Sequence, residues 1–154
     1  MSTTYTTDAK VRNDAGFVNN AYITDPMIDA QRLRAFAIIN SYVGSRYAVS
    51  GLLGGPTFSG SPAAQLLESV EILYAGGLLL IQEYGPEGRD TDKDGYRRVA
   101  DATAMLKDVQ AGNIALFGSD GNLLPSVAAA NQSRPTVAGG FGDGDRSFSV
   151  SDVY

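Results

Sequence analysis

The sequence predicts a mainly α protein, a small bundle of three to four helices followed by an extended C-terminal arm with a short β-strand at its tip. Glycines and prolines gather in clusters that leave three long stretches between them, and each stretch carries apolar residues at helical spacing. From Gly118 onward the composition changes to small and polar residues. These observations divide the 154 residues into an N-terminal segment (1–23), a helical core (24–117) and an arm (118–154).

The first long stretch predicts an amphipathic helix from about Asp25 to Val43. Asp25 and Pro26 form a helix-start signal, because Asp accepts a backbone N–H bond at the N-cap and Pro is tolerated at the first helical position. The residues expected on its apolar face are Ile28, Leu33, Phe36, Ile39 and Val43.

The second stretch predicts a longer helix from Ala63 to Tyr84, opened by Ser61-Pro62 and stopped by Gly85-Pro86. Its second half, residues 75–81, is apolar nearly all round, so this helix belongs at the centre of the fold or in a subunit interface. Gly76 and Gly77 each cost about 1 kcal/mol in a helix relative to Ala. Either close approach of another helix or a kink accounts for them.

The third stretch predicts a helix that begins at Thr91 or Gly95 and ends at Ala111, with Gly112 as its C-cap. A short apolar segment, residues 114–117, follows it and is expected to pack back on the bundle. The residues expected on the apolar face of the helix are Tyr96, Val99, Ala102, Thr103, Leu106 and Val109.

The end of the arm carries a pattern that suits a binding segment. Residues 126–144 hold few large apolar groups and cannot offset their ordering entropy in the free chain. In residues 146–154, however, Phe and Val alternate with Ser at strand period, which favours β-augmentation, the addition of a strand to the sheet of a partner. The alternative is a frayed terminus. The expected partner-binding residues are Arg146, Phe148, Val150, Val153 and Tyr154.

Residues 90–101 fit the calcium-loop pattern, with Asp90, Asp92, Asp94 and Asp101 as the candidate ligands. The twelfth position is Asp rather than Glu, the eighth is Arg97 where an apolar residue is usual, and the chain has no second such loop. The alternative is an ordinary helix N-terminus whose acidic residues favour the helix dipole. Calorimetric titration tests the calcium interpretation, which the absence of heat at millimolar calcium would remove.

The composition argues against an enzyme. The chain has no Cys and no His, which excludes thiol nucleophiles, thiolate metal sites, imidazole bases and Ser-His-Asp triads. Glu68 and Glu71 lie one helical turn apart, as paired catalytic carboxylates do, but without a convergent partner we interpret them as a solvated helix face.

The charge balance and the apolar pattern limit the partners. A net charge of −5 is not the footprint of a protein that binds nucleic acid. The longest apolar stretch, residues 72–82, is shorter than the roughly 20 residues of a spanning helix. The N-terminus has neither a basic nor an apolar region typical of a signal peptide. We therefore expect a soluble protein, made in the cytoplasm, that does not associate with a membrane.

Several runs resemble the small head–tail connector (adaptor, or head-completion) proteins of tailed bacteriophages. The first helix ends in Arg46-Tyr47 and leads into a Gly/Pro loop, a long apolar helix follows, and a third helix ends in a Leu-rich pattern around Gly112. The similarity covers about residues 20–117 and, more loosely, residues 146–148. The runs that carry it are Ile23–Leu33, Ala37–Tyr47, Leu66–Tyr84 and Ala104–Leu116.

This resemblance implies a structural virion protein without enzymatic activity. Such proteins form a homo-oligomeric ring, commonly of twelve subunits, beneath the portal and are followed by a stopper or tail-completion protein. The C-terminal arm would reach the portal, and DNA would pass through the channel without specific binding, because an acidic wall offers phosphates no anchor. The expected location is the neck of the virion, after synthesis in the host cytoplasm. The alternative function is a small calcium-binding interaction module using the Asp90–Asp101 loop.

Overall fold

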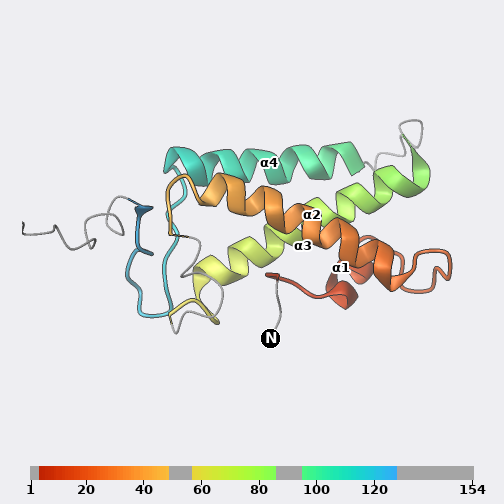
Figure 1. Cartoon of the computed structure of the whole chain (residues 1–154), viewed down its shortest axis with the longest axis horizontal. Coiled ribbons are helices and arrows are strands. Elements are labelled where there is room, and N and C mark those ends of the chain that lie inside the picture. Colours follow the sequence, from red (N-terminus) through yellow and green to blue (C-terminus); the bar gives the residue numbers. More distant parts are fainter. Residues whose placement is uncertain (1–3, 49–56, 86–94, 128–154) are drawn as a thin grey trace, which may run out of the picture.

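A computed structural model describes residues 4–48, 57–85 and 95–127, and the described chain is a bundle of four helices (Figure 1). They are α1 (Asp8–Asp14), α2 (Asp25–Val43), α3 (Pro62–Tyr84) and α4 (Gly95–Ala111). The prediction of a mainly α bundle is confirmed. In the described ranges, β structure amounts to two isolated bridges, Tyr47 with Ser126 and Phe117 with Leu123. The β-strand expected at the tip of the arm lies outside those ranges.

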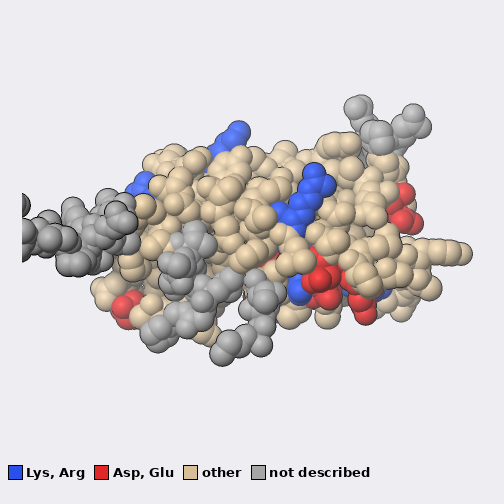
Figure 2. Space-filling model, in the orientation of Figure 1, with Lys and Arg blue, Asp and Glu red and all other residues tan. Residues whose placement is uncertain are grey.

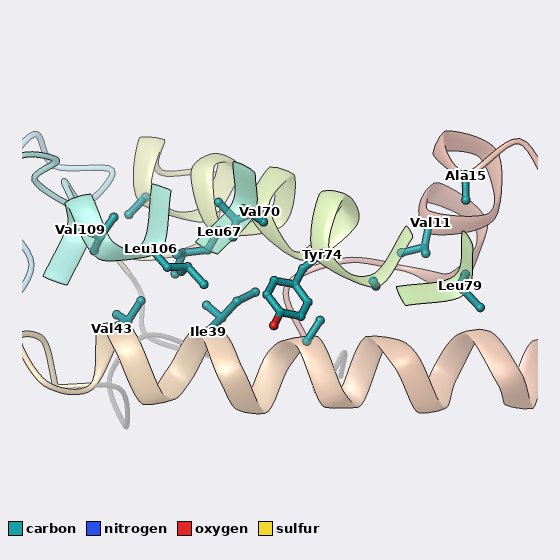
Figure 3. Packing of buried hydrophobic residues seen from close by; sticks show 14 of the residues in the cluster. Val11, Ala15, Ile39, Val43, Leu67, Val70, Tyr74, Leu79, Leu106 and Val109 are labelled. Atoms are coloured by element: carbon teal, nitrogen blue, oxygen red, sulfur yellow. The ribbon is translucent and has the colours of Figure 1, made fainter. Parts of the chain in front are cut away.

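Helix α3 is the centre of the bundle, since α1, α2 and α4 all pack against it. In Figure 3, Leu67, Val70 and Tyr74 of α3 lie opposite Ile39 and Val43 of α2. By length and mean hydropathy (1.5) α3 would also pass as a membrane-spanning helix. A core helix passes the same test. Here three other helices pack against α3, and 44% of its apolar window is buried.

The two glycines in the middle of α3 differ in their surroundings. A Cβ on Gly77 would lie 2.8 Å from the carbonyl oxygen of Gly95 and 2.9 Å from Cγ2 of Val99 in α4. A Cβ on Gly76 would meet no atom closer than 3.4 Å. Of the two explanations offered by the sequence, close approach of another helix is therefore correct at Gly77. The first residue of α4, Gly95, is the other half of the contact.

Local signals set the helix ends. The Ser61 hydroxyl accepts the Ala64 N–H at 3.0 Å and caps α3. Gly112, with φ of +88°, ends α4 as predicted, and its N–H donates to the Asp108 carbonyl oxygen at 3.0 Å. The expected cap of α2 was wrong in one respect. Thr24 occupies the N-cap position, and the Asp25 carboxylate instead accepts a 2.7 Å bond from Arg12.

Two residues expected on apolar faces are exposed. Leu33 of α2 is 45% exposed and Tyr96 of α4 is 53% exposed. Ala35 and Ala102 are buried in these helices, together with larger side chains such as Ile39 and Leu106. The remaining buried positions of both helices follow the predicted spacing.

Residues 4–23 belong to the packed body of the described structure. Residues 4–7, which we call the N-terminal strap, lead through bends into α1, and Thr4 and Thr6 are buried. Val11 of α1 is fully buried in the same core. The 15–24 linker that joins α1 to α2 adds Phe17 and Ile23 to this core.

Candidate functional site

The structure describes one of the four candidate calcium ligands. Asp101 lies in the second turn of α4 with 61% of its side chain exposed, and a carboxylate oxygen is 3.9 Å from Nε of Arg97, four residues earlier. Asp90, Asp92 and Asp94 lie outside the described residues. Within the described ranges, acidic side chains form no group of three or more that could hold a metal ion. The calcium interpretation therefore stays a prediction.

The start of the predicted arm is attached to the bundle. Residues 118–122 form a turn in which the Gly118 N–H donates to the carbonyl oxygen of Asn122 at 2.8 Å. Beyond it, the Ala48 N–H donates to Pro125 at 3.0 Å and the Val127 N–H donates to Arg46 at 2.9 Å. The five predicted partner-binding residues, Arg146, Phe148, Val150, Val153 and Tyr154, lie outside the described residues. The structure thus places residues 125–127 beside the end of α2.

The Arg46-Tyr47 pair organises this end of the bundle. The Tyr47 ring is buried, and its hydroxyl accepts the Leu116 N–H at 3.1 Å. The Arg46 guanidinium lies 5.9 Å from the centre of the Tyr47 ring, close against Gly112. A side chain on Gly112 would collide with that guanidinium, so the pair joins the end of α2 to the end of α4.

The most unusual chemical group in the described structure is Glu71, in the middle of α3. The interpretation of Glu68 and Glu71 as a solvated face is wrong for Glu71, whose side chain is fully buried. One of its carboxylate oxygens accepts the Tyr5 N–H of the N-terminal strap at 2.7 Å. The other, Oε1, is buried without a hydrogen-bond partner. Glu68 is partly exposed and forms an ion pair with Lys10 of α1.

The surroundings of Glu71 favour its protonated form. Burial raises the pKa of Glu71 to about 7, against the lowering effect of the Tyr5 backbone amide and of the Arg32 charge. Burial, and then the charge of Glu71, raises the pKa of the Tyr5 hydroxyl as well. At neutral pH, therefore, the Glu71 side chain is near the midpoint of its titration, and its protonated and charged forms are both present.

Arg32 of α2 is the cation whose charge lowers the pKa of Glu71, but its guanidinium forms ion pairs and hydrogen bonds with other groups. Its side chain pairs with Asp8 at 3.0 Å and Asp29 at 2.8 Å, and it donates to the Thr6 carbonyl oxygen at 3.0 Å. Arg32 thus links the strap, α1 and α2, and Glu71 supplies the link to α3. Because the Glu71 and Thr6 side chains each leave a buried oxygen without a partner, the network is incompletely satisfied.

The spacing of apolar residues along α3 could have indicated that Glu71 is buried. The buried residues Leu67, Tyr74 and Ala75 lie four before, three after and four after it, so Glu71 falls within the apolar stripe of α3. A carboxylate in that stripe must find a donor. The donor is a backbone amide 66 residues away, which no pattern in the sequence identifies.

Apolar side chains are exposed at the two opposite ends of the bundle. At one end, in the α1–α2 linker, Val18 and Tyr22 line a hollow of about 570 Å³, and Tyr22 is 85% exposed. At the other, Phe117 and Leu123 face each other across a β-bridge, and Leu123 is 53% exposed. Figure 1 shows the linker and this bridge at the two ends of the long axis.

The described chain is thus a small helical bundle with a polar strap over a buried carboxylate and with two exposed large apolar side chains at each end. No protein family, curated protein or solved structure matches it. Its function is therefore inferred from its own residues.

Proposed function

We propose that this chain is a head–tail connector of a tailed bacteriophage, a non-enzymatic protein that forms a homo-oligomeric ring, commonly of twelve subunits, beneath the portal. The ring would join the portal to a stopper or tail-completion protein in the neck of the virion. The chain would be made in the host cytoplasm. DNA would pass along an acidic channel without specific binding.

The observation that carries the proposal is the exposure of large apolar side chains at both ends of one bundle, Val18 and Tyr22 among polar linker residues at one end and Phe117 and Leu123 at the other. A ring needs a heterologous interface, in which one surface of a subunit meets a different surface of the next. Val18 and Tyr22 supply one such surface, and Phe117 and Leu123 supply the other. In Figure 2 several acidic and basic groups gather near the lower middle of the face, and most of the rest carries few charges, as suits a surface that neighbours cover.

The arrangement of the resembling runs supports the same proposal. The runs that end at Tyr47, Tyr84 and Leu116 correspond to α2, α3 and α4 with its following turn, and they pack together as one unit. The arm leaves this unit beside Arg46, at the end that carries Phe117 and Leu123. An arm fixed at that end is suitably placed to hold a partner that lies beyond the ring.

Native mass spectrometry of the purified chain tests ring formation. It should give a ring mass, and Tyr22→Ser or Leu123→Ser should reduce it to smaller species. Lys107→Ala, on the exposed side of α4, is the matched control and should leave the ring mass unchanged. A chain that stays monomeric at high concentration, with or without portal protein, would contradict ring formation.

The arm is tested separately. Deletion of residues 134–154 should abolish attachment to portal-containing heads, while circular dichroism shows that the helical core remains folded. Normal attachment of the truncated chain would remove the role of the arm.

A further inference from the structure

Four buried side-chain atoms of the network around Glu71 have no hydrogen-bond partner in the described chain. They are Oγ1 of Thr6, Oδ1 of Asp8, Nε of Arg32 and Oε1 of Glu71. Oδ1 of Asp8 faces Arg32 in an ion pair, but without the geometry of a hydrogen bond. Because buried polar groups are normally paired, four such atoms in one network point to a further partner.

Consecutive contacts join the four side chains. Nη1 of Arg32 lies 3.0 Å from Oδ1 of Asp8 and donates to the Thr6 carbonyl oxygen at 3.0 Å. Nε of Arg32 belongs to the same planar guanidinium group. The Thr6 backbone amide donates to the Glu71 carboxylate, which also accepts the Tyr5 N–H. The four atoms are therefore grouped where the strap, α1, α2 and α3 meet.

The four atoms divide evenly into donors and acceptors. The Thr6 hydroxyl and the Nε–H of Arg32 donate, whereas the carboxylate oxygens of Asp8 and Glu71 accept. Water is the small ligand that offers both kinds of partner, and buried waters make about three hydrogen bonds to polar groups that are otherwise unpaired. A metal cation fits the set less well, because it would lie beside the positive guanidinium.

We propose that this junction is a binding site for one long-lived internal water molecule, which donates to the carboxylates of Asp8 and Glu71 and accepts from Thr6 and Arg32. Each of the four groups comes from a different segment, so the water links the strap to three helices at once. The proposal goes beyond the connector function, since it requires neither a portal nor a ring.

Oxygen-17 magnetic relaxation dispersion tests the proposal, because its amplitude measures the water molecules held inside the folded chain. In Glu71→Met an apolar side chain of similar length replaces the carboxylate, and the amplitude should fall by the contribution of one water molecule. Glu71→Gln keeps a polar group at the site and should keep the wild-type amplitude. Gln65→Met, at an exposed position of the same helix, is the matched control and should also leave the amplitude unchanged.

Equal amplitudes for the wild type and Glu71→Met, with both chains folded by circular dichroism, would overturn the proposal. A high-resolution crystal structure of the wild type gives a test that needs no variant. It should show an isolated density peak about 2.7–3.2 Å from at least three of the four atoms. A direct hydrogen bond between the Thr6 and Glu71 side chains in place of that peak would overturn the proposal.

A bound cation is the other result that would overturn it. In that case the unfolding temperature would be higher in sodium or potassium chloride than in tetramethylammonium chloride at the same ionic strength. For a bound water we expect equal unfolding temperatures in the three salts. A chain that stays monomeric leaves all these measurements unaffected, so this proposal and the connector function fail independently.

Discussion

Two of the contacts of helix α3, one with α4 and one with the N-terminal strap, are opposite in character. Toward α4 the contact is apolar and close, with Gly77 against Gly95 and with Leu106 and Val109 fully or almost fully buried. Toward the strap it is polar, with Glu71 and Arg32 holding backbone groups. The first interface is stabilised by close apolar packing, which does not depend on pH. The second uses a buried carboxylate, whose contribution depends on its protonation.

The contrast explains why both interfaces occur on one helix. Close apolar packing holds the bundle together, because dispersion and burial act without regard to solvent conditions. A buried carboxylate adds little net stability, since desolvation offsets its hydrogen bonds, but it selects one geometry for the strap. On this view the α4 side of α3 maintains the fold, whereas the stability that the strap side contributes depends on the protonation of Glu71.

The largest expected effect lies on the apolar side. Replacing the fully buried Leu106 with Ala should lower the free energy of unfolding by about 4 kcal/mol, because it leaves a cavity between α3 and α4. Urea unfolding followed by circular dichroism measures the loss. Lys107→Ala, on the exposed side of α4, is the matched control and should change stability by less than about 0.5 kcal/mol. Equal losses in the two variants would refute the assignment of this interface as the core.

The polar side should show its effect in the pH dependence of stability. In the folded chain the pKa of Glu71 is raised from 4.5 to about 7, so the folded state binds the proton more tightly than the unfolded state. The contribution of Glu71 is therefore complete below pH 4.5, falls as pH rises to 7 and is then constant, a total of about 3 kcal/mol.

Comparison of the wild type with Glu71→Gln isolates this contribution. The Gln side chain still offers an oxygen to the Tyr5 N–H but does not titrate. The difference between the two unfolding free energies should change by about 3 kcal/mol between pH 4.5 and 7.5. Ser69→Ala, on the exposed face of the same helix, should keep the wild-type profile. Parallel curves for the wild type and Glu71→Gln would show that the carboxylate is not buried in solution.

The two glycines of α3 provide a matched pair. Gly77→Ala places a Cβ 2.8 Å from the Gly95 carbonyl oxygen and should lower stability by about 2 kcal/mol, because backbone must move. Gly76→Ala meets only ordinary contacts and should raise stability by about 0.5 kcal/mol through better helix propensity. Thermal unfolding of both variants measures the difference. If Gly77→Ala is also stabilising, the helices are not as close as described.

The smallest expected effect concerns the Tyr5 side chain of the strap. Tyr5→Phe keeps the ring and removes the 2.6 Å hydrogen bond to Asn40, at a cost of about 1 kcal/mol. Chemical denaturation of Tyr5→Phe and of the double variant Tyr5→Phe/Asn40→Ala measures the coupling. A further loss as large as that of Asn40→Ala alone would show that the two side chains do not interact.

The sequence predicts the parts of this structure that local rules determine. The bounds of α2 and α3 and the end of α4 follow from Pro, Ser and Gly at the helix ends and from regular apolar spacing. The seven-residue α1 has Thr7 at its N-cap and the positive-φ Gly16 just beyond its end, but it is too short for a repeated apolar pattern, and its position depends on contacts with α2 and α3. Glu71 was assigned to solvent because carboxylates usually lie there. Its partner, Tyr5, is distant in the chain, and only the assembled fold brings the two together.

The long sequence separation between Tyr5 and Glu71 has a kinetic consequence. Closing a loop of 66 residues is entropically more costly than forming the α3–α4 pair, so the strap should dock after the rest of the bundle has folded. By the same reasoning it should be the first unit to open under native conditions. Amide hydrogen exchange at Tyr5 would then report local opening, whereas exchange within the buried turns of α3 would report global unfolding.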